Sequence, residues 1–467
     1  MLTRRRFLAG SASLYGAIIG RYAFADANGH TEPAVLTAAP AAVPLVDADK
    51  PTRVWAYNGL VPGPLLRVNQ GEKLRVKLRN RLPVGTTVHW HGIRIDNAMD
   101  GVANLTQPPV SQESEFEYAF VAPDAGTFWY HPHFRSSEAV GRGLYGLLIV
   151  DEPEPPQVDR DLPLALDDWR LNDNDQIDVA SLGNLHDAAH QGRLGNVLSV
   201  NGLPAPEVTV APGERLRLRL ANTANSRVMT LDFGALSPQL IAIDGQPVSA
   251  RGAPDARLIL APGQRADAIV DIDLEPAETT DLTVVTRGGT TPAVRFVASR
   301  QRLREQPLDA PISLPANPLK RRLELDSALG VELLMQGGAM GRMRVGRYRG
   351  AQLGMRELAQ QGQVWALNGD VGMPEAPLFS APRGQTVRLN MINDTRWPHA
   401  MHFHGHHARV LRAGRREAPD VWRDTVLVDP GERIDVAFVA DNPGRWMLHC
   451  HMLEHQASGM ATWFVVN

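Results

Sequence analysis

Short runs of alternating apolar and polar residues recur along most of the 467-residue chain. The segment LRVKL at 74–78 is typical, because every second side chain is aliphatic and the side chains between them are basic. A period of two places alternate side chains on opposite faces of a β-strand. Glycine and asparagine bound such runs, and both residues are favoured in turns. Since no long helical periodicity interrupts the pattern, the sequence predicts an all-β fold.

An internal repeat organises the chain. FVAPDAGTFWYHPH at 120–133 aligns without a gap with FVADNPGRWMLHCH at 438–451. Upstream of these blocks, HWHG at 89–92 has its counterpart in HFHG at 402–405. A middle copy, recognisable in VNGLPAPEVTV at 200–210, carries no histidine pairs. Because a single core rarely grows beyond about 250–300 residues, the three copies predict three β-sandwich domains.

Two proline-rich stretches, at 153–158 and 305–318, separate the copies. We therefore expect the first domain at 33–155, the second at 156–305 and the third at 318–467.

Residues 1–25 have the pattern of an export signal. TRRRFL at 3–8 fits a twin-arginine motif, and the apolar run that follows ends in a small-x-small cleavage site at 23–25. An ordinary secretory signal is the alternative. No later apolar run approaches the roughly 18–20 residues of a membrane span, so we expect no stable membrane anchor. The sequence thus predicts a soluble periplasmic protein that the twin-arginine export machinery delivers.

Charge and cysteine content narrow the chemistry further. The formal net charge is −3 and the charges are well mixed, which argues against a nucleic-acid partner. Cys450 is the single cysteine of the chain. In an oxidising compartment it cannot form an internal disulfide, so we expect a free thiol or a metal ligand.

Histidines gather in the two outer copies of the repeat. Ten of the fifteen form four clusters: His89 and His91; His131 and His133; His399, His402 and His404; and His449, His451 and His455. Each cluster contains a pair two residues apart, and residues i and i+2 of a strand share one face. Four pairs supply eight imidazoles, which suit three metal ions held between the first and third domains.

A second set of donors remains once the pairs are counted. It comprises His399, Cys450, His455 and Met460. A thiolate, two imidazoles and a weak thioether are the ligands of a blue-copper electron-transfer site. Zinc also accepts cysteine and histidine, but it has no redox chemistry. Because side chains alternate along a strand, Cys450 would face one site while its neighbours His449 and His451 face the other, which gives electrons a short covalent path.

The motifs HWHG, WYHPH, HAMHFHG and HCHMLEHQASGM closely resemble the copper signatures of the three-domain multicopper oxidases, the laccase-like enzymes. The resemblance covers essentially the whole mature chain and implies three cupredoxin-like Greek-key β-sandwiches. It also implies four coppers per chain, namely one type 1, one type 2 and two type 3. The implied type 1 ligands are His399, Cys450, His455 and Met460. The type 2 ligands are His89 and His402, and the type 3 ligands are His91, His131, His133, His404, His449 and His451.

The resemblance further implies one-electron oxidation of four donors, with reduction of dioxygen to two waters. The donors would be phenols, aromatic amines or low-valent metal ions. Four protons are consumed, so a carboxylate near the cluster is expected. Asp100 matches the position of the family's acid, although an aspartate before glycine is also common in turns. Many bacterial members carry glutamate where this chain has Gln456, which cannot titrate. Glu454 is the neighbouring candidate, with a surface position as the alternative.

Other functions fit the same residues less well. A cuprous oxidase of periplasmic copper tolerance is the first alternative, since thioethers bind Cu(I) and four methionines lie in 335–355. They are Met335, Met340, Met343 and Met355. A non-catalytic periplasmic scaffold would have lost ligands that this chain keeps. A two-domain-type copper nitrite reductase does not fit three repeats.

The remaining histidines call for plain interpretations. We expect His406 and His407 to support or pack against the metal sites, and His30, His186 and His190 to be solvated.

Overall fold

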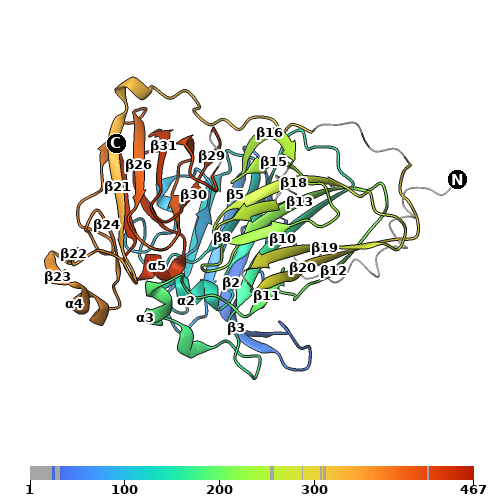
Figure 1. Cartoon of the computed structure of the whole chain (residues 1–467), viewed down its shortest axis with the longest axis horizontal. Helices are drawn as coiled ribbons and strands as arrows, with labels where there is room; N and C mark the ends of the chain where they lie inside the picture. Colours follow the sequence, from blue (N-terminus) through green and yellow to red (C-terminus); the bar gives the residue numbers. More distant parts are fainter. Residues whose placement is uncertain are drawn as a thin grey trace.

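The computed structural model describes residues 24–26, 32–252, 257–286, 288–305, 308, 312–417 and 420–467. Most of the predicted export signal, residues 1–23, and His30 lie outside these ranges. The described chain consists mainly of strands that form three pairs of sheets, here called the first, second and third sandwich in chain order (Figure 1). The all-β prediction is confirmed. Within the same ranges, no helix combines the length and apolar character needed to span a membrane.

The first sandwich joins a five-stranded and a four-stranded sheet. The larger sheet has the order β1 (Phe24–Asp26), β4 (Leu65–Asn69), β9 (Gly146–Asp151), β8 (Gly126–His131) and β6 (His89–His91). The smaller has the order β3 (Thr52–Tyr57), β2 (Ala34–Val43), β5 (Lys73–Asn80) and β7 (Glu115–Val121). On β5, Leu74, Val76 and Leu78 are fully buried, so the period-two pattern places its apolar face in the core.

The second sandwich follows the same plan. Its six-stranded sheet has the order β11 (Val197–Val200), β10 (Arg160–Trp169), β13 (Arg215–Asn222), β18 (Arg265–Asp271), β15 (Gln239–Ile243) and β16 (Gln246–Gly252). Its five-stranded sheet has the order β12 (Glu207–Val210), β20 (Gly289–Ala298), β19 (Thr279–Thr286), β14 (Met229–Asp232) and β17 (Arg257–Leu260). A cluster of buried aliphatic side chains from both sheets forms the core.

The third sandwich carries a small additional hairpin, β22 (Val345–Tyr348) and β23 (Ala351–Gly354). Its six-stranded sheet has the order β24 (Trp365–Leu367), β21 (Leu329–Gly337), β26 (Thr386–Asn393), β31 (Arg433–Val439), β28 (Ala408–Arg412) and β29 (Trp422–Arg423). Its five-stranded sheet has the order β25 (Ser380–Ala381), β33 (Ala461–Val466), β32 (Gly444–Cys450), β27 (His399–Phe403) and β30 (Thr425–Val428).

Helical segments in the described chain are short. They are α2 (Ser136–Gly141), α3 (Leu185–Ala189), α4 (Met355–Gln360) and α5 (Leu453–Ala457), with 3-10 turns η1 (Asn97–Met99), η2 (Val179–Ser181) and η4 (Leu325–Ser327). Helix α5 directly follows β32 and contacts both α2 and α3 (Figure 1). Segments from all three sandwiches therefore meet at α5.

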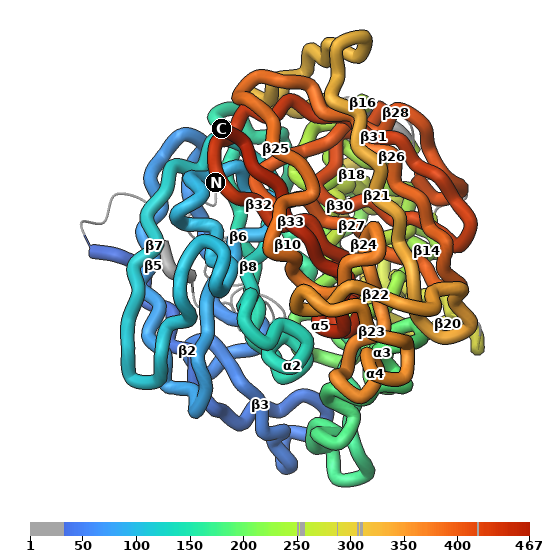
Figure 2. Tube along the Cα trace, turned by 90° about the vertical axis from the view of Figure 1, so that its left-hand side faces the viewer, coloured from blue at the N-terminus to red at the C-terminus, as the bar shows by residue number. Residues whose placement is uncertain are grey.

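The repeat is visible in strand register. In the first sandwich β6 pairs with β8 so that His89 lies opposite His131. In the third, β27 pairs with β32 so that His402 lies opposite His449. Strands β6 and β32 are labelled near each other in Figure 2, and the rings of His89 on β6 and His402 on β27 have centroids 5.7 Å apart. Two equivalent cross-strand histidine pairs are thereby brought to the contact between the first and third sandwiches.

Candidate metal centres

His399, Cys450 and His455 form a group, here called the mononuclear group, at one end of the third sandwich. Cys450 Sγ lies 3.6 Å from Nδ1 of His399 and 3.6 Å from Nδ1 of His455. The two Nδ1 atoms are 3.1 Å apart, and all three side chains are fully buried. Met460, the fourth predicted donor, is buried in the same core, and its carbonyl accepts the Cys450 N–H. One thiol and two imidazoles thus converge on one point.

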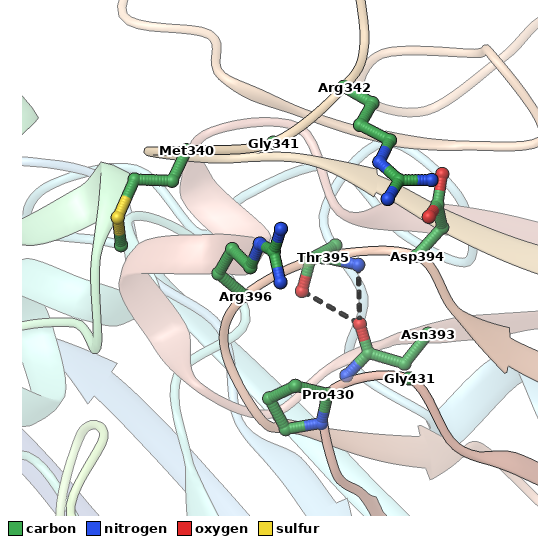
Figure 3. A pocket seen from close by; sticks show the side chains of 9 residues that line it. All are labelled: Met340, Gly341, Arg342, Asn393, Asp394, Thr395, Arg396, Pro430 and Gly431. Atoms are coloured by element: carbon green, nitrogen blue, oxygen red, sulfur yellow. Dashed lines mark hydrogen bonds between the residues drawn. The ribbon is translucent and has the colours of Figure 1, made fainter.

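The outward-facing nitrogens of the mononuclear group have polar partners. Nε2 of His399 lies 2.9 Å from the Thr395 hydroxyl, which also bonds to Asn393 (Figure 3). Nε2 of His455 lies 2.9 Å from the backbone oxygen of His190. His190 is half-buried rather than solvated as predicted, because its ring lies against Trp397. His186, by contrast, is exposed.

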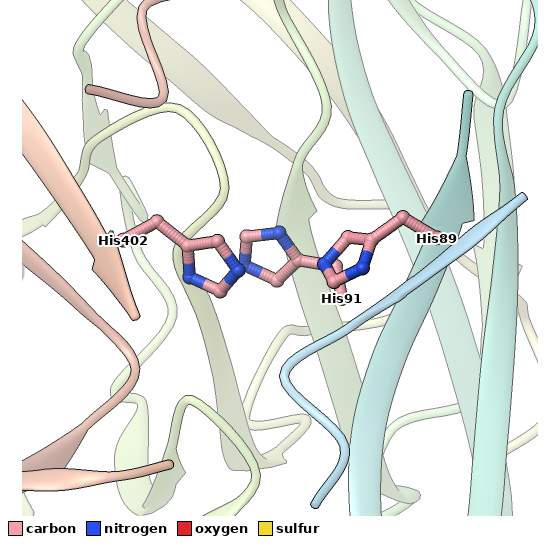
Figure 4. Close-up of side chains that lie close together, drawn as sticks. All are labelled: His89, His91 and His402. Carbon is pink, nitrogen blue, oxygen red and sulfur yellow. The ribbon is translucent and has the colours of Figure 1, made fainter. Parts of the chain in front are cut away.

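Eight further histidines form a second group, here called the histidine cluster, between the first and third sandwiches. Potential ligand atoms lie within 4.8 Å of one another in three sets: His91, His131 and His451; His133, His404 and His449; and His89, His91 and His402. The ring of His91 stacks on that of His402 with centroids 3.8 Å apart, and the ring of His89 lies 5.7 Å from that of His402 (Figure 4). All eight residues are buried. The structure therefore brings together every member of the four predicted pairs.

Hydrogen bonds at one ring nitrogen leave the other free to bind a metal. Nδ1 of His89 lies 2.9 Å from the Asp100 carbonyl, and Nδ1 of His402 lies 3.0 Å from the Asp424 carbonyl. A carbonyl accepts only from N–H, so Nε2 of each ring carries the lone pair. Both Nε2 atoms are buried without a hydrogen-bond partner among the described residues. Leaving buried polar atoms unpaired costs free energy, which a bound metal ion would offset. The donor set therefore fits a metal.

His91 has the opposite orientation. Its Nε2 lies 3.2 Å from a carboxylate oxygen of Asp424, and its Nδ1 is buried and unpaired. We infer that His91 would bind a metal through Nδ1, whereas His89 and His402 would bind through Nε2.

Burial sets the protonation states of these groups. It holds the pKa of His91, His131 and His399 well below the ordinary value, and lowers the pKa of His455 to about 4. The imidazoles are therefore neutral at pH 7, which is the form that binds metals. Burial also raises the pKa of the Cys450 thiol to about 12. A thiolate at this position consequently requires a cation beside it.

Asp100 lies directly against the histidine cluster. Its carboxylate oxygens lie 3.0 Å from Nδ1 of His404 and 3.2 Å from Nδ1 of His89. The side chain is only 2 % exposed. It is therefore placed to exchange a proton beside the cluster.

Glu454 is buried, so the surface alternative for this residue is wrong. Its carboxylate accepts hydrogen bonds from the Ser226 hydroxyl at 2.5 Å, the Asn225 amide at 2.7 Å and the Arg193 backbone N–H at 3.2 Å. Burial nevertheless raises its pKa. All three partners belong to the second sandwich, which lacks histidine pairs but also contacts α5 through α3.

Asp424 supports the cluster and was not singled out from the sequence. It is fully buried, lies 3.2 Å from His91 Nε2, and pairs with both terminal nitrogens of Arg265 at 2.8 and 2.7 Å. The Arg265 guanidinium holds the pKa of this carboxyl well below its usual range, against the cost of burial. An isolated aspartate and an isolated arginine, 159 residues apart, carry no sequence signal that would pair them.

His406 and His407 pack behind the cluster as predicted. Both are buried, and His407 Nε2 lies 3.1 Å from the Asp244 backbone oxygen.

Known proteins are similar to this chain in sequence and in architecture. Multicopper oxidase family models match residues 42–155, 160–296 and 348–467. The multicopper oxidase MmcO of Mycobacterium tuberculosis is 30 % identical over 483 residues, which covers 97 % of this chain and 90 % of that protein. The crystal structure of a multi-copper oxidase from Pseudomonas thermotolerans superimposes with a TM-score of 0.81 at 30 % identity, covering 96 % of this chain and all of the other. Lac15 from a marine microbial metagenome is 38 % identical, with a TM-score of 0.74 and coverage of 93 % and 100 %. The chain belongs to the multicopper oxidase family and is a copper-dependent oxidoreductase.

Proposed function

We propose that the chain is a laccase-like oxidase that couples one-electron oxidation of small donors to four-electron reduction of dioxygen to water. The observation that carries the proposal is the position of Cys450. Its thiol lies in the mononuclear group, while its two chain neighbours, His449 and His451, lie in the histidine cluster. Two peptide bonds thus connect the place where an electron enters with the place where dioxygen would be reduced.

Four coppers per chain fit the donors. A type 1 copper would take His399, Cys450, His455 and Met460, and a type 2 copper would take His89 and His402. The type 3 pair would take the two sets His91, His131 and His451, and His133, His404 and His449, each of which converges on one point. When bound, copper supplies the one-electron steps at the first site and the reduction of dioxygen at the other three. We also propose that the three domains span residues 33–155, 156–305 and 318–467.

Side chains of the chain itself would manage the protons. Asp100 touches His404 and His89, so a proton on its carboxylate is within reach of the cluster. Glu454, whose pKa is raised by burial, is the second side chain that could hold a proton. Gln456 is unable to titrate. The proposed proton route therefore runs through Asp100, and Glu454 is the second candidate.

A second candidate is a cuprous oxidase of copper tolerance. Of the four methionines in 335–355, Met340 is 69 % exposed, beside the mononuclear group. Met335 and Met343 are instead buried in apolar clusters. Met355 is partly buried against the same cluster as Met343. One exposed thioether supports this substrate less strongly than a methionine-rich loop would.

We also propose export to the periplasm by the twin-arginine machinery. The support is the TRRRFL motif at 3–8. That route carries folded proteins, which suits a chain whose histidine cluster forms between the first and third sandwiches.

Copper content and Cys450→Ser test the proposed function. We expect about four coppers per wild-type chain, an intense blue absorption band, and dioxygen uptake with a phenol, Fe(II) or Cu(I). Cys450→Ser should lose the blue band and all donor oxidation, because Cys450 is the only thiol of the chain, yet retain most of the remaining copper. A serine variant that stayed blue would rule out the assignment.

A further inference from the structure

A small pocket lies beside the mononuclear group and has no role in the reaction derived so far. It has a volume of about 190 Å³ and is lined by the loop after β21, by the end of β26 and the three residues that follow it, and by the turn before β31 (Figure 3). Ligand pockets for drug-sized molecules usually measure roughly 300–1,000 Å³. The smaller volume suits a single substituted ring.

Thr395 connects this pocket with the proposed type 1 site. It lines the pocket, and its hydroxyl lies 2.9 Å from Nε2 of His399. His399 and His455 are both fully buried, so a donor cannot touch either ring directly. The outward nitrogen of His455 is bonded to the His190 carbonyl. A donor in the pocket would be separated from a type 1 imidazole by one hydroxyl group.

The floor of the pocket is fixed in place. The Asn393 side-chain oxygen accepts bonds from the backbone N–H of Thr395 at 2.9 Å and from its hydroxyl at 2.7 Å. Asn393 in turn donates to the Trp397 carbonyl. The Thr395 hydroxyl is therefore held in place beside His399.

The rim of the pocket is positively charged. Arg342 and Arg396 are both exposed and line it, together with one acidic residue, Asp394, whose side chain faces Arg342 (Figure 3). Among the described residues, no carboxylate lies within 4.0 Å of the Arg396 guanidinium. Arginine pairs with planar anions such as carboxylates through two parallel hydrogen bonds. The rim thus offers a cation suited to an anionic substituent.

We propose that this pocket binds single-ring phenols that carry an anionic group, with the anion on Arg396 and the phenolic oxygen toward Thr395. This substrate class rests on the proposed function. Each donor gives one electron to the type 1 site and its hydroxyl proton to water, and leaves as a phenoxyl radical. Four donors supply the four electrons that reduce one dioxygen to two waters, with four protons taken up.

The test compares 2,6-dimethoxyphenol with its 4-carboxylate by dioxygen uptake in wild type and in Arg396→Glu. We expect the ratio of kcat/KM for the carboxylate to kcat/KM for the neutral phenol to fall about 3- to 10-fold, because loss of an exposed ion pair costs up to about 5-fold and the like charge adds repulsion. The effect should lie in KM and shrink at high salt. Arg396→Gln, which only removes the charge, should lower the ratio by a smaller factor.

Arg356→Glu is the matched control. Arg356 is exposed on α4 and does not line the pocket, so its variant changes the net charge equally but should keep the ratio. An unchanged ratio in Arg396→Glu, or an equal fall in Arg356→Glu, would overturn the pocket assignment while leaving the oxidase intact. Absence of dioxygen uptake by the wild type with either phenol would overturn the phenol oxidase itself. The blue band of Arg396→Glu, if intact, shows that the type 1 site has formed.

Discussion

At the residue scale, Asp100 contacts the histidine cluster in two ways. Its backbone oxygen fixes Nδ1 of His89, and its carboxylate lies 3.0 Å from Nδ1 of His404. Asparagine would keep the backbone contact, the side-chain shape and an oxygen acceptor for His404. It would lose the negative charge, one acceptor oxygen and the ability to carry a proton. The substitution therefore separates the architectural role of Asp100 from its proton-transfer role.

We predict that Asp100→Asn lowers steady-state dioxygen uptake by roughly 10²–10⁴-fold, the usual contribution of a positioned acid or base. Reduction of the blue band by donor should stay fast, because that step takes place on the opposite side of Cys450. Anaerobic stopped-flow reduction, set beside dioxygen uptake, measures the two steps separately.

Unchanged uptake in Asp100→Asn would reject the proton role and turn attention to Glu454. Slowing of both steps together would point to lost copper instead, which metal analysis detects.

The metal ligands were predictable at this scale, whereas the groups that hold them were not. Histidine and cysteine are uncommon, and their spacing along a strand has a direct geometric meaning. Asp424, Arg265 and Ser226 are ordinary polar residues, and their roles arise from contacts between sandwiches. Likewise, the burial of Glu454 depends on partners more than 200 residues away in sequence.

At the scale of elements, the alternating pattern predicted where strands form. It predicted less well whether the polar face of a strand is buried. On β5 the apolar face is buried and the basic face is more accessible, as the pattern indicates. On β13, RLRLRLAN, both faces are buried. Arg217 is buried because it pairs with Glu152 of the first sandwich at 2.7 Å and with Asp267 at 2.6 Å. Alternation indicates a strand, but only the neighbouring sandwich decides whether its polar face meets water.

The second sandwich supplies no ligand to the histidine cluster, but the turn between β17 and β18 limits the space around it. Gly263 in this turn has φ +85°, and a Cβ there would lie 2.9 Å from His91 and 3.0 Å from His451. Gly71 is a close match, with φ +82° and nothing within 4 Å of its Cβ position. Alanine at either site meets the same backbone strain, but only alanine at 263 presses on two imidazoles.

We predict that Gly263→Ala lowers dioxygen uptake by about 10- to 100-fold, because small displacements of reacting groups are costly. The blue band should survive, since Cys450 and its partners are untouched. Gly71→Ala should lose some thermal stability and keep its uptake. Copper content, absorption and uptake of both variants measure this difference, and equal uptake in the two would contradict it.

At the scale of the whole molecule, the contact between the sandwiches is built from buried charge. Arg265 of the second sandwich pairs with Asp424 of the third at 2.7 Å and lies 3.5 Å from Asp244. Arg217 ties the first sandwich to the second. Breaking one partner of a buried pair is strongly destabilising. The three sandwiches are therefore expected to unfold together.

Buried histidines give the copper-free protein a marked sensitivity to acid. Burial lowers the pKa of ten of them: His91, His131, His133, His399, His402, His404, His406, His449, His451 and His455. An unfolded histidine takes up a proton near pH 6.5, whereas in the folded state His455 does so near 4 and His406 near 3. The stability present above pH 6.5 is therefore lost as the pH falls. Four buried carboxylates act in the opposite direction, because burial raises their pKa: Asp167, Asp244, Glu417 and Glu454.

Since the histidines outnumber those carboxylates, we predict that the free energy of unfolding of the copper-free protein falls steeply between pH 7 and 5. Each histidine contributes up to about 1.4 kcal/mol per pH unit, against a total stability usually near 5–15 kcal/mol. Urea unfolding at a series of pH values measures the slope. His406→Gln should make the slope shallower by up to one such contribution, because it removes a buried histidine that is not a proposed ligand. His186→Gln, at an exposed site, should leave the slope unchanged. Stability that stayed level or rose from pH 7 to 5 would show that the buried carboxylates outweigh the histidines.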